Sequence, residues 1–509
     1  MGPMTARGDW REGLPAGVER AALPPAAGAI RHDSREVRPG DVFVCIRGER
    51  ADGHVFAPAA VSAGAVALVA QAGHEAPLAA LGVPVAVVPD TRVALAALAV
   101  AHEGYPGRRL TVVGVTGTDG KSTTAAFTLA ALEGCGLRAG LLTTVGTCVA
   151  GRELPNPTRL TTQEAPYVQH LLAEMVEAGC THAVVEATSH GLALHRLDGC
   201  EFDVAVLTNL SPDHLDFHGS FEAYRAAKAR LFAMLDEPTT KPVRRVAVLN
   251  ADDAHWGAFA RATHAEIATY GLRARSADVR AREIVPWPDG STFVVTVGDE
   301  SVEASVRLPG RFNVANATAA IAVAAVLGLD PQAAAAGVAG CAGVPGRMER
   351  IEGAPFAVVV DYAHTPEAMR QVLAALRELV EGRLIVVFGC AGERARERRS
   401  GIGAAVAELA DYAVVTEEDP RSEPPEAIAG EIAQALIAGG AAEGERFERV
   451  PERRAAIARA IALARPGDLV LLAGKGHEST IERAGGPLPW DERAVARALI
   501  AERFGAAPP

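Results

Sequence analysis

The chain of 509 residues carries 50 Lys and Arg against 62 Asp and Glu, which gives a formal net charge of −12. This acidic balance excludes a protein that coats nucleic acid, because neutralising phosphates requires a surplus of basic residues. The hydrophobic fraction of 49% excludes disorder along the whole chain, and no apolar run reaches the ~18–20 residues that span a bilayer. We therefore expect no nucleic-acid partner and no membrane insertion.

The seven cysteines are scattered along the chain, and no two of them have CxxC spacing. This pattern argues against a disulfide framework and against a structural zinc site. The first residues also lack the basic-then-apolar design of a secretory signal. We expect a reduced, cytoplasmic α/β protein, and at ~150 residues per domain its length predicts about three domains.

The first block, residues 1–109, alternates short β-branched runs with Ala-rich runs. Its strand candidates are residues 41–46, 65–70 and 83–88, separated by Gly- and Pro-containing turns. Such alternation is typical of a parallel sheet with helical crossovers, so we expect an N-terminal α/β domain.

The second block, residues 110–344, opens with "LTVVGVTGTDGKSTTAAF", an apolar strand pattern that runs through a Gly-rich turn into a helix. Further buried-strand candidates follow at residues 182–187, 203–209 and 245–250. The segment "STFVVTVGDESVEASVRL" instead alternates like a hairpin with Gly298-Asp299 at its turn, and residues 313–329 have a strong helix pattern. We expect a central domain with a parallel sheet.

The third block, residues 345–509, contains four strand patterns, each followed by a polar or Gly-rich turn: residues 356–364, 383–392, 412–421 and 469–478. In open parallel sheets ligands collect at the carboxyl ends of the strands. These four turns are therefore the expected site-forming edge of a Rossmann-like C-terminal domain.

The sharpest local signal is a phosphate-loop pattern, "GTDGKSTT", that starts at Gly117. Glycines let backbone N–H groups approach phosphate oxygens, and the start of a helix adds a favourable dipole. Lys121 can reach the outer phosphates, and the Ser122 hydroxyl can ligate Mg²⁺. The full GxxxxGK[ST] pattern is not met, because Val115 stands where it requires Gly.

Two polar groups follow later strands of the second block. Glu186 ends the strand "HAVVEA", where a carboxylate is placed either for Mg²⁺ or simply for solvent. The segment "TNLSPDHLDFHG" concentrates Asp213, His214, Asp216 and His218, either as a metal site or as a polar turn before a capped helix. Lys228, taken alone, has the pattern of a surface lysine.

Together these residues resemble a known family. The segments "GTDGKSTT", "VEATSHG", "TNLSPDHLDFHG", "GRFNVANATAA", "GVPGRME", "DYAHTPEAM" and "GKGHE" occur in the order of the Mur ligases, and the set is similar to the UDP-N-acetylmuramoyl-tripeptide synthetases, the MurE type. The resemblance implies three α/β domains: residues 1–109 to bind the UDP-sugar, 110–344 to bind ATP, and 345–509 to bind an amino acid.

The resemblance implies an ATP-dependent amide ligase of peptidoglycan precursor synthesis. The γ-carboxylate of D-Glu in UDP-MurNAc-L-Ala-D-Glu would form an acyl phosphate, and the amine of a diamino acid would then displace phosphate. Catalysis would rest on positioning and charge neutralisation. The partners implied are these small molecules, with Mg²⁺ as cofactor, and we expect a monomer.

Site residues follow from the resemblance by position. Lys121 would clamp the outer phosphates, Ser122 and Glu186 would hold one Mg²⁺, His214 would hold a second, and Lys228 would carry a CO₂-derived carbamate that supports the metal. The other nucleotide contacts implied are Gly117, Thr118, Asp119, Gly120, Thr123, Asn313, Asn316, Arg347, Asp361 and His364. The contacts implied for the UDP-sugar and its dipeptide are Ser34, Thr161, Thr162, Thr188 and Arg196. The contacts implied for the amino acid are Arg394, Glu418, Asp419, Arg421, Gly474 and Glu478.

The identity of the added amino acid stays open between two kinds. Family members that add meso-diaminopimelate typically read Asp-Asn-Pro-Arg where this chain reads Glu418-Asp419-Pro420-Arg421. The extra charge of Asp419 favours a distal ammonium, and hence L-lysine or L-ornithine. Arg421 can still grip a distal carboxylate and keeps meso-diaminopimelate close behind.

Two rival functions share parts of this pattern. Another Mur ligase step or a folylpolyglutamate-type ligase would share the architecture, although "DYAHTPEAM" favours the tripeptide step. A non-catalytic nucleotide-dependent switch would need the phosphate loop, but not Glu186, His214 and Lys228 with it. Asp119 is a further departure, because the family often has Asn there and an acid opposes phosphate binding.

Overall fold

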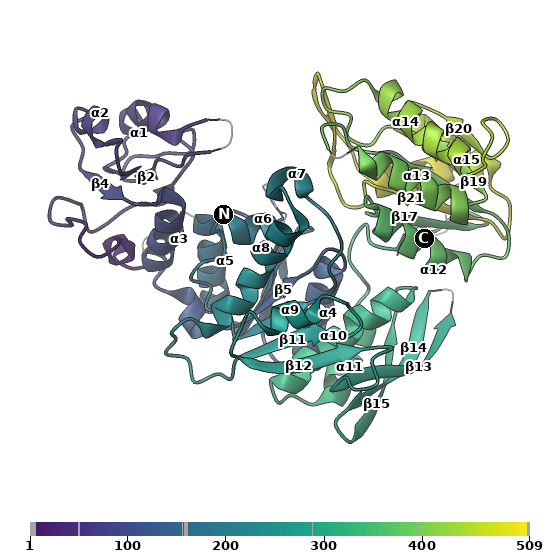
Figure 1. The fold of residues 1–509 in the computed structure, drawn as a ribbon, viewed down its shortest axis with the longest axis horizontal. Coiled ribbons are helices and arrows are strands. Elements are labelled where there is room, and N and C mark those ends of the chain that lie inside the picture. The colour runs from purple at the N-terminus through teal and green to yellow at the C-terminus, as the bar shows by residue number, and fades with distance from the viewer. Residues whose placement is uncertain are drawn as a thin grey trace.

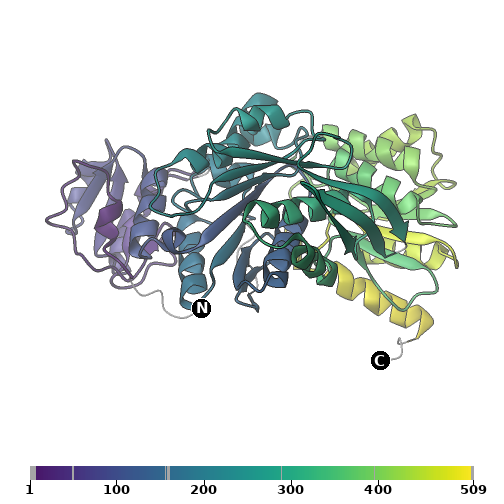
Figure 2. The same ribbon diagram turned by 90° about the horizontal axis from the view of Figure 1, so that it is seen from below.

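The computed structural model describes residues 7–48, 51–154, 156, 161–287, 289–394 and 396–505. Figure 1 shows three lobes in chain order, and Figure 2 shows the central lobe between the other two. Each lobe is built on its own main sheet. This arrangement confirms the expected α/β class with three domains, while the boundaries at residues 109 and 344 stay predictions.

The first domain is a parallel four-stranded sheet in the order β1-β2-β3-β4. Its strands are β1 (Ile30–Arg31), β2 (Val42–Val44), β3 (Ala67–Gln71) and β4 (Val85–Val88), and its α-helices are α1 (Ala57–Ser62), α2 (Glu75–Ala79) and α3 (Thr91–His102). Short 3₁₀ helices lie at Trp10–Gly13, Gly53–Phe56 and Pro106–Arg109. All three predicted strands are confirmed; β1 was not predicted, because two residues carry no readable period.

The central domain has an 11-stranded sheet in the order β15-β14-β13-β12-β11-β10-β5-β9-β6-β7-β8. Its strands are β5 (Thr111–Thr116), β6 (Ala139–Leu142), β7 (Thr147–Val149), β8 (Arg152–Leu154), β9 (His182–Glu186), β10 (Val204–Leu207), β11 (Val246–Asn250), β12 (Glu266–Gly271), β13 (Val279–Trp287), β14 (Gly290–Val297) and β15 (Glu300–Val306). The strands from β6 to β13 along this order pair in parallel, and both edges of the sheet are antiparallel. The predicted hairpin is β14–β15, with its turn at Gly298-Asp299.

The helices of the central domain cover both faces of this sheet. They are α4 (Lys121–Gly134), α5 (Ala165–Glu177), α6 (Ser189–Ala193), α7 (Leu215–His218), α8 (Phe221–Ala233), α9 (Trp256–Ala260), α10 (Arg311–Val326) and α11 (Pro331–Gly340), with a 3₁₀ turn at Met234–Asp236. On β5, Val113 and Val115 pack with α4 and α10, while Val112 faces a second core with α5 and α8. A strand buried on both faces reads as a continuous apolar run, which is why the sequence predicted it.

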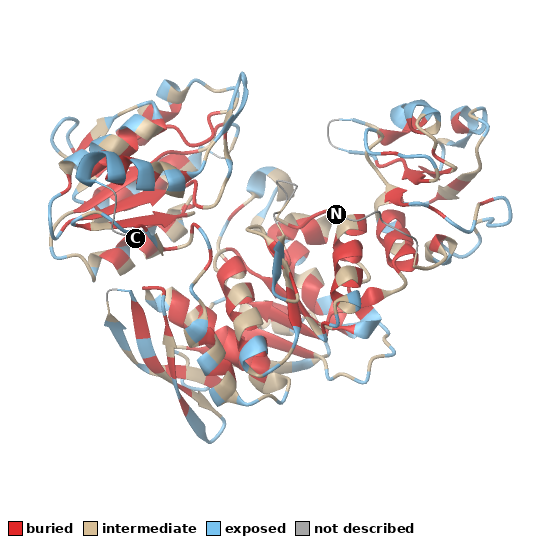
Figure 3. Ribbon diagram, turned by 180° about the vertical axis from the view of Figure 1, so that it is seen from behind, coloured by how far each residue is buried: buried red, intermediate tan, exposed pale blue. Residues whose placement is uncertain are grey.

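The third domain is a six-stranded sheet in the order β16-β17-β21-β18-β19-β20, parallel except at β16. Its strands are β16 (Glu349–Arg350), β17 (Ala357–Asp361), β18 (Leu384–Phe388), β19 (Tyr412–Val415), β20 (Phe447–Arg449) and β21 (Leu469–Ala473), beside a hairpin of β22 (Thr480–Arg483) and β23 (Gly486–Pro489). Its helices are α12 (Pro366–Arg377), α13 (Glu397–Leu409), α14 (Pro425–Ala438), α15 (Arg453–Leu463) and α16 (Glu492–Phe504). Figure 3 shows the strands of this domain mostly red, that is buried, and the helices that cover them partly pale blue, that is exposed.

Ion pairs join neighbouring domains. Arg394 of the third domain lies 3.2 Å from Asp216 on α7, and Arg398 pairs with Asp213 next to it. At the other side of the central domain, Arg108 Nε lies 2.9 Å from Glu201 Oε1. The segment that follows the carboxyl end of β18, together with the start of α13, therefore lies against the α7 region of the central domain. No described helix has the length and apolar character needed to cross a membrane.

Candidate active site

The phosphate-loop pattern lies between the end of β5 and the start of α4, as predicted. Gly117 has a φ of +151°, and a Cβ there would lie 1.8 Å from the Thr208 hydroxyl oxygen, so only glycine fits. The segment after β10 holds the loop: the Asp119 N–H donates to Asn209 Oδ1 at 2.9 Å, and the Thr208 hydroxyl donates to the Asp119 carbonyl at 2.7 Å. These contacts fix the backbone of the loop from an adjacent strand.

Two side chains of the loop, Lys121 and Asp119, are ionisable. Lys121 Nζ donates to the Thr118 carbonyl at 2.6 Å, which folds the ammonium back over the loop. Burial raises the pKa of the Asp119 carboxyl, although nearby Lys121 opposes that shift. Because the raised pKa favours the uncharged acid, Asp119 opposes a bound phosphate less than an exposed aspartate would.

Ser122 and Glu186 form a buried pair of oxygen ligands. The Ser122 hydroxyl donates to Glu186 Oε2 at 2.9 Å, and the same oxygen accepts from the Thr144 N–H at 3.0 Å and from the Thr144 hydroxyl at 3.1 Å. The pair forms because β5 and β9 are parallel neighbours whose carboxyl ends meet. Hydroxyl and carboxylate oxygens are the ligands that Mg²⁺ prefers, so these residues fit that ion.

His214 lies in a separate group of aromatic side chains. It adopts a φ of +52° just before α7, and its ring contacts His190 edge-on at a centroid distance of 4.7 Å. Burial lowers the pKa of His214 and so favours the neutral imidazole that metals bind. Its buried Nδ1 has no hydrogen-bond partner among the described residues, so His214 has a nitrogen available to a metal. No described group places it with Glu186 and a third ligand within 4.8 Å.

Lys228 is not the surface residue that its isolated pattern favours. Its side chain is 2% exposed, Nζ donates to the Gly117 carbonyl at 2.6 Å, and the ammonium lies 4.6 Å from the centre of the Tyr224 ring. Burial, with nearby Lys121, lowers the pKa of Lys228 well below its usual value. The structure thus brings a lysine that favours the neutral amine against the phosphate loop.

The other predicted nucleotide contacts lie on both sides of the domain boundary. Asn316 Oδ1 accepts from Thr124 on α4 at 3.1 Å, and Asn316 Nδ2 donates to Asn313 Oδ1 at 3.3 Å, so both asparagines are tied to the helix that the phosphate loop opens. Across the boundary, the Arg347 guanidinium stacks on Tyr362 at 4.5 Å, and its buried Nε has no partner among the described residues.

Asp361 and His364 lie at the carboxyl end of β17. Both carboxylate oxygens of Asp361 accept backbone N–H groups, from Met348 at 2.8 Å and Ala363 at 2.7 Å. His364 Nδ1 lies 2.8 Å from the Tyr362 carbonyl, and burial lowers the pKa of His364 to about 4. These residues shape the third domain's edge beside Arg347.

The residues predicted for the muramoyl dipeptide gather next to Glu186. The hydroxyls of Thr162 and Thr188 lie 2.8 Å apart, and Arg196 Nη1 donates to the Thr162 carbonyl at 3.0 Å. Arg196 is already paired with Glu164 at 2.7 Å, so a substrate carboxylate would share that guanidinium. Thr161 is half-buried beside this group, and Ser34 is half-buried in the first domain; neither side chain makes a hydrogen bond within the described part of the chain.

Two carboxyl groups of the third domain contact one buried ammonium. Lys475 has a fully buried side chain; Nζ lies 2.8 Å from Asp419 Oδ1 and also contacts Glu478 Oε2. Although burial opposes its charge, Glu478 and Asp419 together raise the pKa of Lys475. The negative charge expected from Asp419 is therefore paired within the chain, with an ammonium that it shares with Glu478.

Glu418 is the carboxyl group of this cluster that has a free oxygen. Its Oε2 is buried without a hydrogen-bond partner among the described residues. Gly474 makes room for it: φ is +102°, and a Cβ there would lie 2.7 Å from that oxygen. Burial raises the pKa of Glu418 to about 7, with Glu478 and Asp419 adding to the shift and Lys475 opposing it. Glu418 can thus gain or lose its proton near neutral pH.

The two arginines predicted for the amino acid differ in their partners. Arg394 pairs with Asp216 across the domain boundary. The Arg421 side chain has neither a hydrogen bond nor an ion pair among the described residues, while its backbone N–H donates to the Glu482 carbonyl at 2.8 Å. The structure thus leaves the Arg421 guanidinium without a partner among the described residues.

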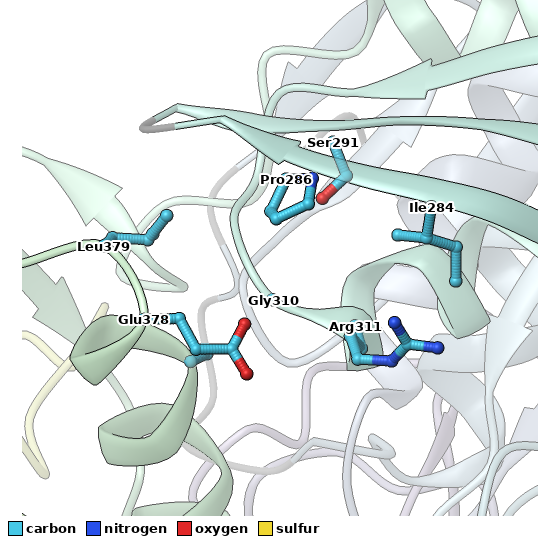
Figure 4. A pocket seen from close by; sticks show the side chains of 8 residues that line it. Ile284, Pro286, Ser291, Gly310, Arg311, Glu378 and Leu379 are labelled. Atoms are coloured by element: carbon cyan, nitrogen blue, oxygen red, sulfur yellow. The ribbon is translucent and has the colours of Figure 1, made fainter.

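Cavities lie along the seam between the central and third domains. One of about 410 Å³ is lined by residues from Arg307–Pro309, the linker Ala342–Arg350 and the start of β17. It includes Arg347, a predicted nucleotide contact, and its volume suits a small molecule. The cavity in Figure 4, between Arg311 and Glu378, has a volume of about 30 Å³ and holds about one water, so it is no substrate site.

The first domain has a cluster of three residues of the kinds that bind metal ions: Asp52, His54 and His74. His54 Nε2 accepts from the Gln71 N–H at 3.0 Å, so its Nδ1, 2.5 Å from Asp52, carries the proton. The rings of His54 and His74 also stack face to face at 4.0 Å, so their in-plane lone pairs do not converge on one point. The cluster therefore does not fit a metal ion.

Lys475 and Arg453 were missed by the sequence analysis. Lys475 lies inside the quoted segment "GKGHE", so its position in a Gly-flanked turn after a buried strand was the available signal. Arg453 has no motif that distinguishes it from a surface arginine, yet it is fully buried.

Comparisons with known proteins agree with this geometry. The family descriptions "Mur ligase family, catalytic domain", "Mur ligase middle domain" and "Mur ligase, glutamate ligase domain" match residues 28–103, 115–324 and 346–476. A UDP-N-acetylmuramyl-tripeptide synthetase of Roseiflexus sp. (strain RS-1) is 48% identical, covering 95% of this chain and 97% of the relative. A UDP-N-acetylmuramoyl-L-alanyl-D-glutamate--2,6-diaminopimelate ligase of Streptomyces coelicolor is 44% identical over 94% of this chain and 93% of the relative. A solved structure of a ligase with the same printed name has a TM-score of 0.65 at 33% identity, covering 97% of this chain and 99% of the other. The chain therefore belongs to the Mur ligase family and is an ATP-dependent ligase.

Proposed function

We propose that this ligase joins the amine of a diamino acid to the D-Glu side chain of UDP-MurNAc-L-Ala-D-Glu, as a step of peptidoglycan precursor synthesis. One observation carries the proposal: the carboxyl end of the central sheet has a phosphate loop beside a buried oxygen pair, and the third domain has a cluster of carboxyl groups at the ends of its strands. The first suits ATP, and the second suits an amine-bearing acceptor. The printed names of the relatives support the same step.

The reaction has two steps. The D-Glu γ-carboxylate attacks the γ-phosphorus of ATP, the bond to the bridging oxygen breaks, and ADP leaves. The acceptor amine then attacks the carbonyl carbon of the acyl phosphate, phosphate leaves, and the nitrogen loses a proton. Lys121 and the N–H groups at the start of α4 neutralise the charge on the transferred phosphoryl group. Arg347 holds the nucleotide from the third-domain side.

Ser122 and Glu186 would hold a magnesium ion, and His214 has the free nitrogen for a second site. When bound, Mg²⁺ supplies charge neutralisation to the phosphates. The amine of Lys228 is the group we assign to a CO₂-derived carbamate, because its low pKa favours the nucleophilic neutral form that adds CO₂. Thr162, Thr188 and Arg196 would orient the dipeptide next to Glu186, with Thr161 beside them, and Ser34 would contact the UDP-sugar.

We assign the acceptor to the diamino acids with a distal ammonium and no distal carboxylate, L-lysine or L-ornithine. Asp419 is not the group we assign to that ammonium, because it is already paired with Lys475. We assign Glu418 instead: its buried Oε2 lacks a partner, and an incoming ammonium would favour its ionised form. Glu478, which contacts Lys475 and Tyr362, lines the same pocket.

One observation favours meso-diaminopimelate as a second candidate. The Arg421 guanidinium has no partner in the described part of the chain, and a distal carboxylate would pair with it. The Streptomyces relative is named for that acceptor. We place the reaction in the cytoplasm and expect a monomer; the seven free thiols agree with a reducing compartment.

The test is phosphate release from ATP with UDP-MurNAc-L-Ala-D-Glu and, in separate reactions, L-lysine, L-ornithine and meso-diaminopimelate. We expect release with lysine or ornithine at least tenfold faster than with diaminopimelate. Release with diaminopimelate alone would overturn the acceptor assignment in favour of Arg421. Absence of release with all three would overturn the proposed ligation step.

A further inference from the structure

Arg453 is the first residue of α15, and its side chain is completely buried. Its guanidinium makes a bidentate pair with Glu492, with Nη2 2.7 Å from Oε1 and Nε 2.9 Å from Oε2. It also donates from Nη1 to the Glu417 carbonyl at 3.0 Å and from Nη2 to the Ala473 carbonyl at 2.8 Å. One planar group therefore links three separate segments.

The two carbonyls lie at the ends of two strands, directly before residues that we assign to the acceptor amino acid. Glu417 follows β19 and directly precedes Glu418; Ala473 ends β21 and directly precedes Gly474. These strands are not neighbours, because β18 lies between them in the sheet. Adjacent strands lie ~4.8 Å apart, so no ladder hydrogen bond fixes the distance between the two loops. Arg453 spans this gap directly.

The bridge is fully buried, so Arg453 and Glu492 are not exposed to a bound amino acid. Glu492 holds the guanidinium plane from the opposite side and also accepts from Trp490 Nε1 at 2.6 Å, so the arginine has a fixed orientation. Contacts above the bridge, such as that of Lys475 with Asp419, use side chains that line the pocket itself. A fixed distance between the loops is the condition for Glu418 and Glu478 to meet one amino acid together.

We propose that Arg453 is a positioning residue for the acceptor amino acid, which sets the separation of the loops at residues 417–421 and 474–478. This inference rests on the proposed function, because it assigns those loops to the acceptor. Arginine is required for geometry as well as charge: its fork reaches two carbonyls and a carboxylate at once, and the point charge of a lysine does not.

The first experiment measures KM and kcat for each substrate in wild type, Arg453→Lys and Glu492→Gln. For Arg453→Lys we expect the acceptor KM to rise at least tenfold, the KM values for ATP and the UDP-sugar to stay within twofold, and kcat to fall by less than threefold. Glu492→Gln should raise the acceptor KM about threefold, because the amide keeps the shape but weakens the pair. An acceptor KM within twofold of wild type in Arg453→Lys, or equal rises for all three substrates, would overturn the inference.

The matched control is Arg383→Lys. Arg383 pairs with Asp468 at 2.7 Å and joins β18 to β21 in the same sheet, but at its amino end. This variant should leave the acceptor KM unchanged. A rise equal to that of Arg453→Lys would mean that general loosening of the sheet explains the effect, and would overturn the inference.

Hydrogen exchange separates this inference from the proposed function, because it requires no turnover. In Arg453→Lys the amides of residues 417–421 and 474–478 should exchange at least fivefold faster, while those of β18 and of the phosphate loop stay unchanged. Unchanged exchange in both loops would overturn the positioning role even if the wild type is active. An inactive wild type with faster loop exchange would overturn the proposed function alone.

Discussion

The carboxyl ends of two parallel sheets are organised in different ways. After β5 and β9 in the central domain, Ser122, Glu186 and the loop at Gly117 are held by neutral hydroxyls and backbone groups. After β19 and β21 in the third domain, Asp419 and Glu478 contact the ammonium of Lys475. The first region has hydroxyl and carboxylate oxygens that fit a cation and backbone N–H groups that fit phosphates. The second pairs carboxylates with an ammonium inside the protein.

The residues of the phosphate loop lie close together in the sequence, whereas those of the third-domain region come from distant segments. The phosphate loop, its lysine and its hydroxyl lie within eight consecutive residues, and the side chains of Thr208, Asn209 and Lys228 hold its backbone. The acceptor pocket needs Lys475 for its charge balance and Arg453 for its spacing, and these come from separate elements. Substitutions in the central region should therefore lower the rate of the reaction. Substitutions in the third domain should instead change the KM for the acceptor amino acid and the stability of the fold.

The largest effect is expected for Lys121→Met. Removing the ammonium that neutralises phosphoryl charge should lower kcat about 10³-fold, the size seen when a preorganised charge-stabilising group is lost. The melting temperature should stay within 1–2 °C, about the shift from a loss of less than 1 kcal/mol, because the side chain donates a single hydrogen bond, to Thr118. Phosphate release and thermal unfolding measure the two quantities. A fall in activity of under tenfold would contradict the role of Lys121 at the phosphates.

Lys228→Ala should lose activity about 10²-fold, because it removes the amine that would carry the carbamate. Millimolar acetate should restore part of the activity by supplying a carboxylate in the emptied space. Formamide, a neutral molecule of similar size, serves as the control and should restore none. Full activity in the untreated variant would contradict the carbamate assignment.

Glu186→Gln should raise the Mg²⁺ concentration needed for half-maximal activity about 10–100-fold, the range expected when a metal-binding group is weakened. The amide still accepts from Ser122 and Thr144, so the fold should be kept. Glu164→Gln is the matched control: Glu164 pairs with Arg196 nearby but lies outside the oxygen pair. Equal Mg²⁺ dependence in both variants would contradict the metal role of Glu186.

Lys475→Met should destabilise the chain by about 3–5 kcal/mol, because it leaves Asp419 and Glu478 buried without their cation. The acceptor KM should also rise about tenfold. Lys241→Met breaks another buried pair, with Asp203 in the central domain, and should destabilise similarly while leaving the acceptor KM unchanged. Chemical denaturation and steady-state kinetics give both values. An unchanged acceptor KM in Lys475→Met would contradict a role of Lys475 in binding the acceptor amino acid.

The smallest effect is a pH dependence at Glu418. Its pKa is raised to about 7, so the group is a neutral acid below that pH and a carboxylate above it. The wild-type KM for lysine or ornithine should therefore fall as the pH rises from 6 to 8. Glu418→Gln should remove this dependence and raise the KM about fivefold at pH 8. The ratio of variant to wild type cancels the ionisation of the acceptor itself; a ratio that stays constant with pH would contradict the role of Glu418.

Much of the fold was predictable because the central strands of each sheet are apolar on both faces. Short edge strands such as β8, with Arg152 and Glu153, carry no such signal. The resemblance to the Mur ligases was confirmed, and the non-catalytic switch was wrong, because three family descriptions and close relatives cover the chain.

The candidate site was predictable only where chemistry is local. Sequence reasoning placed Ser122 after one strand and Glu186 at the end of another; the structure brings them together because β5 and β9 are parallel neighbours. It could not show that Lys228 is buried, or that Lys475 pairs with Asp419, because both depend on packing between distant segments.

The buried pair of Arg453 and Glu492 also bears on how acceptor choice can change over generations. The pair holds carbonyl groups of the main chain, which are present whatever side chains occupy positions 418, 419 and 421. A lineage could therefore exchange those side chains one at a time while the loops keep their separation. Selection for a new cell-wall amino acid would then change positions 418, 419 and 421, while Arg453 and Glu492 stay the same.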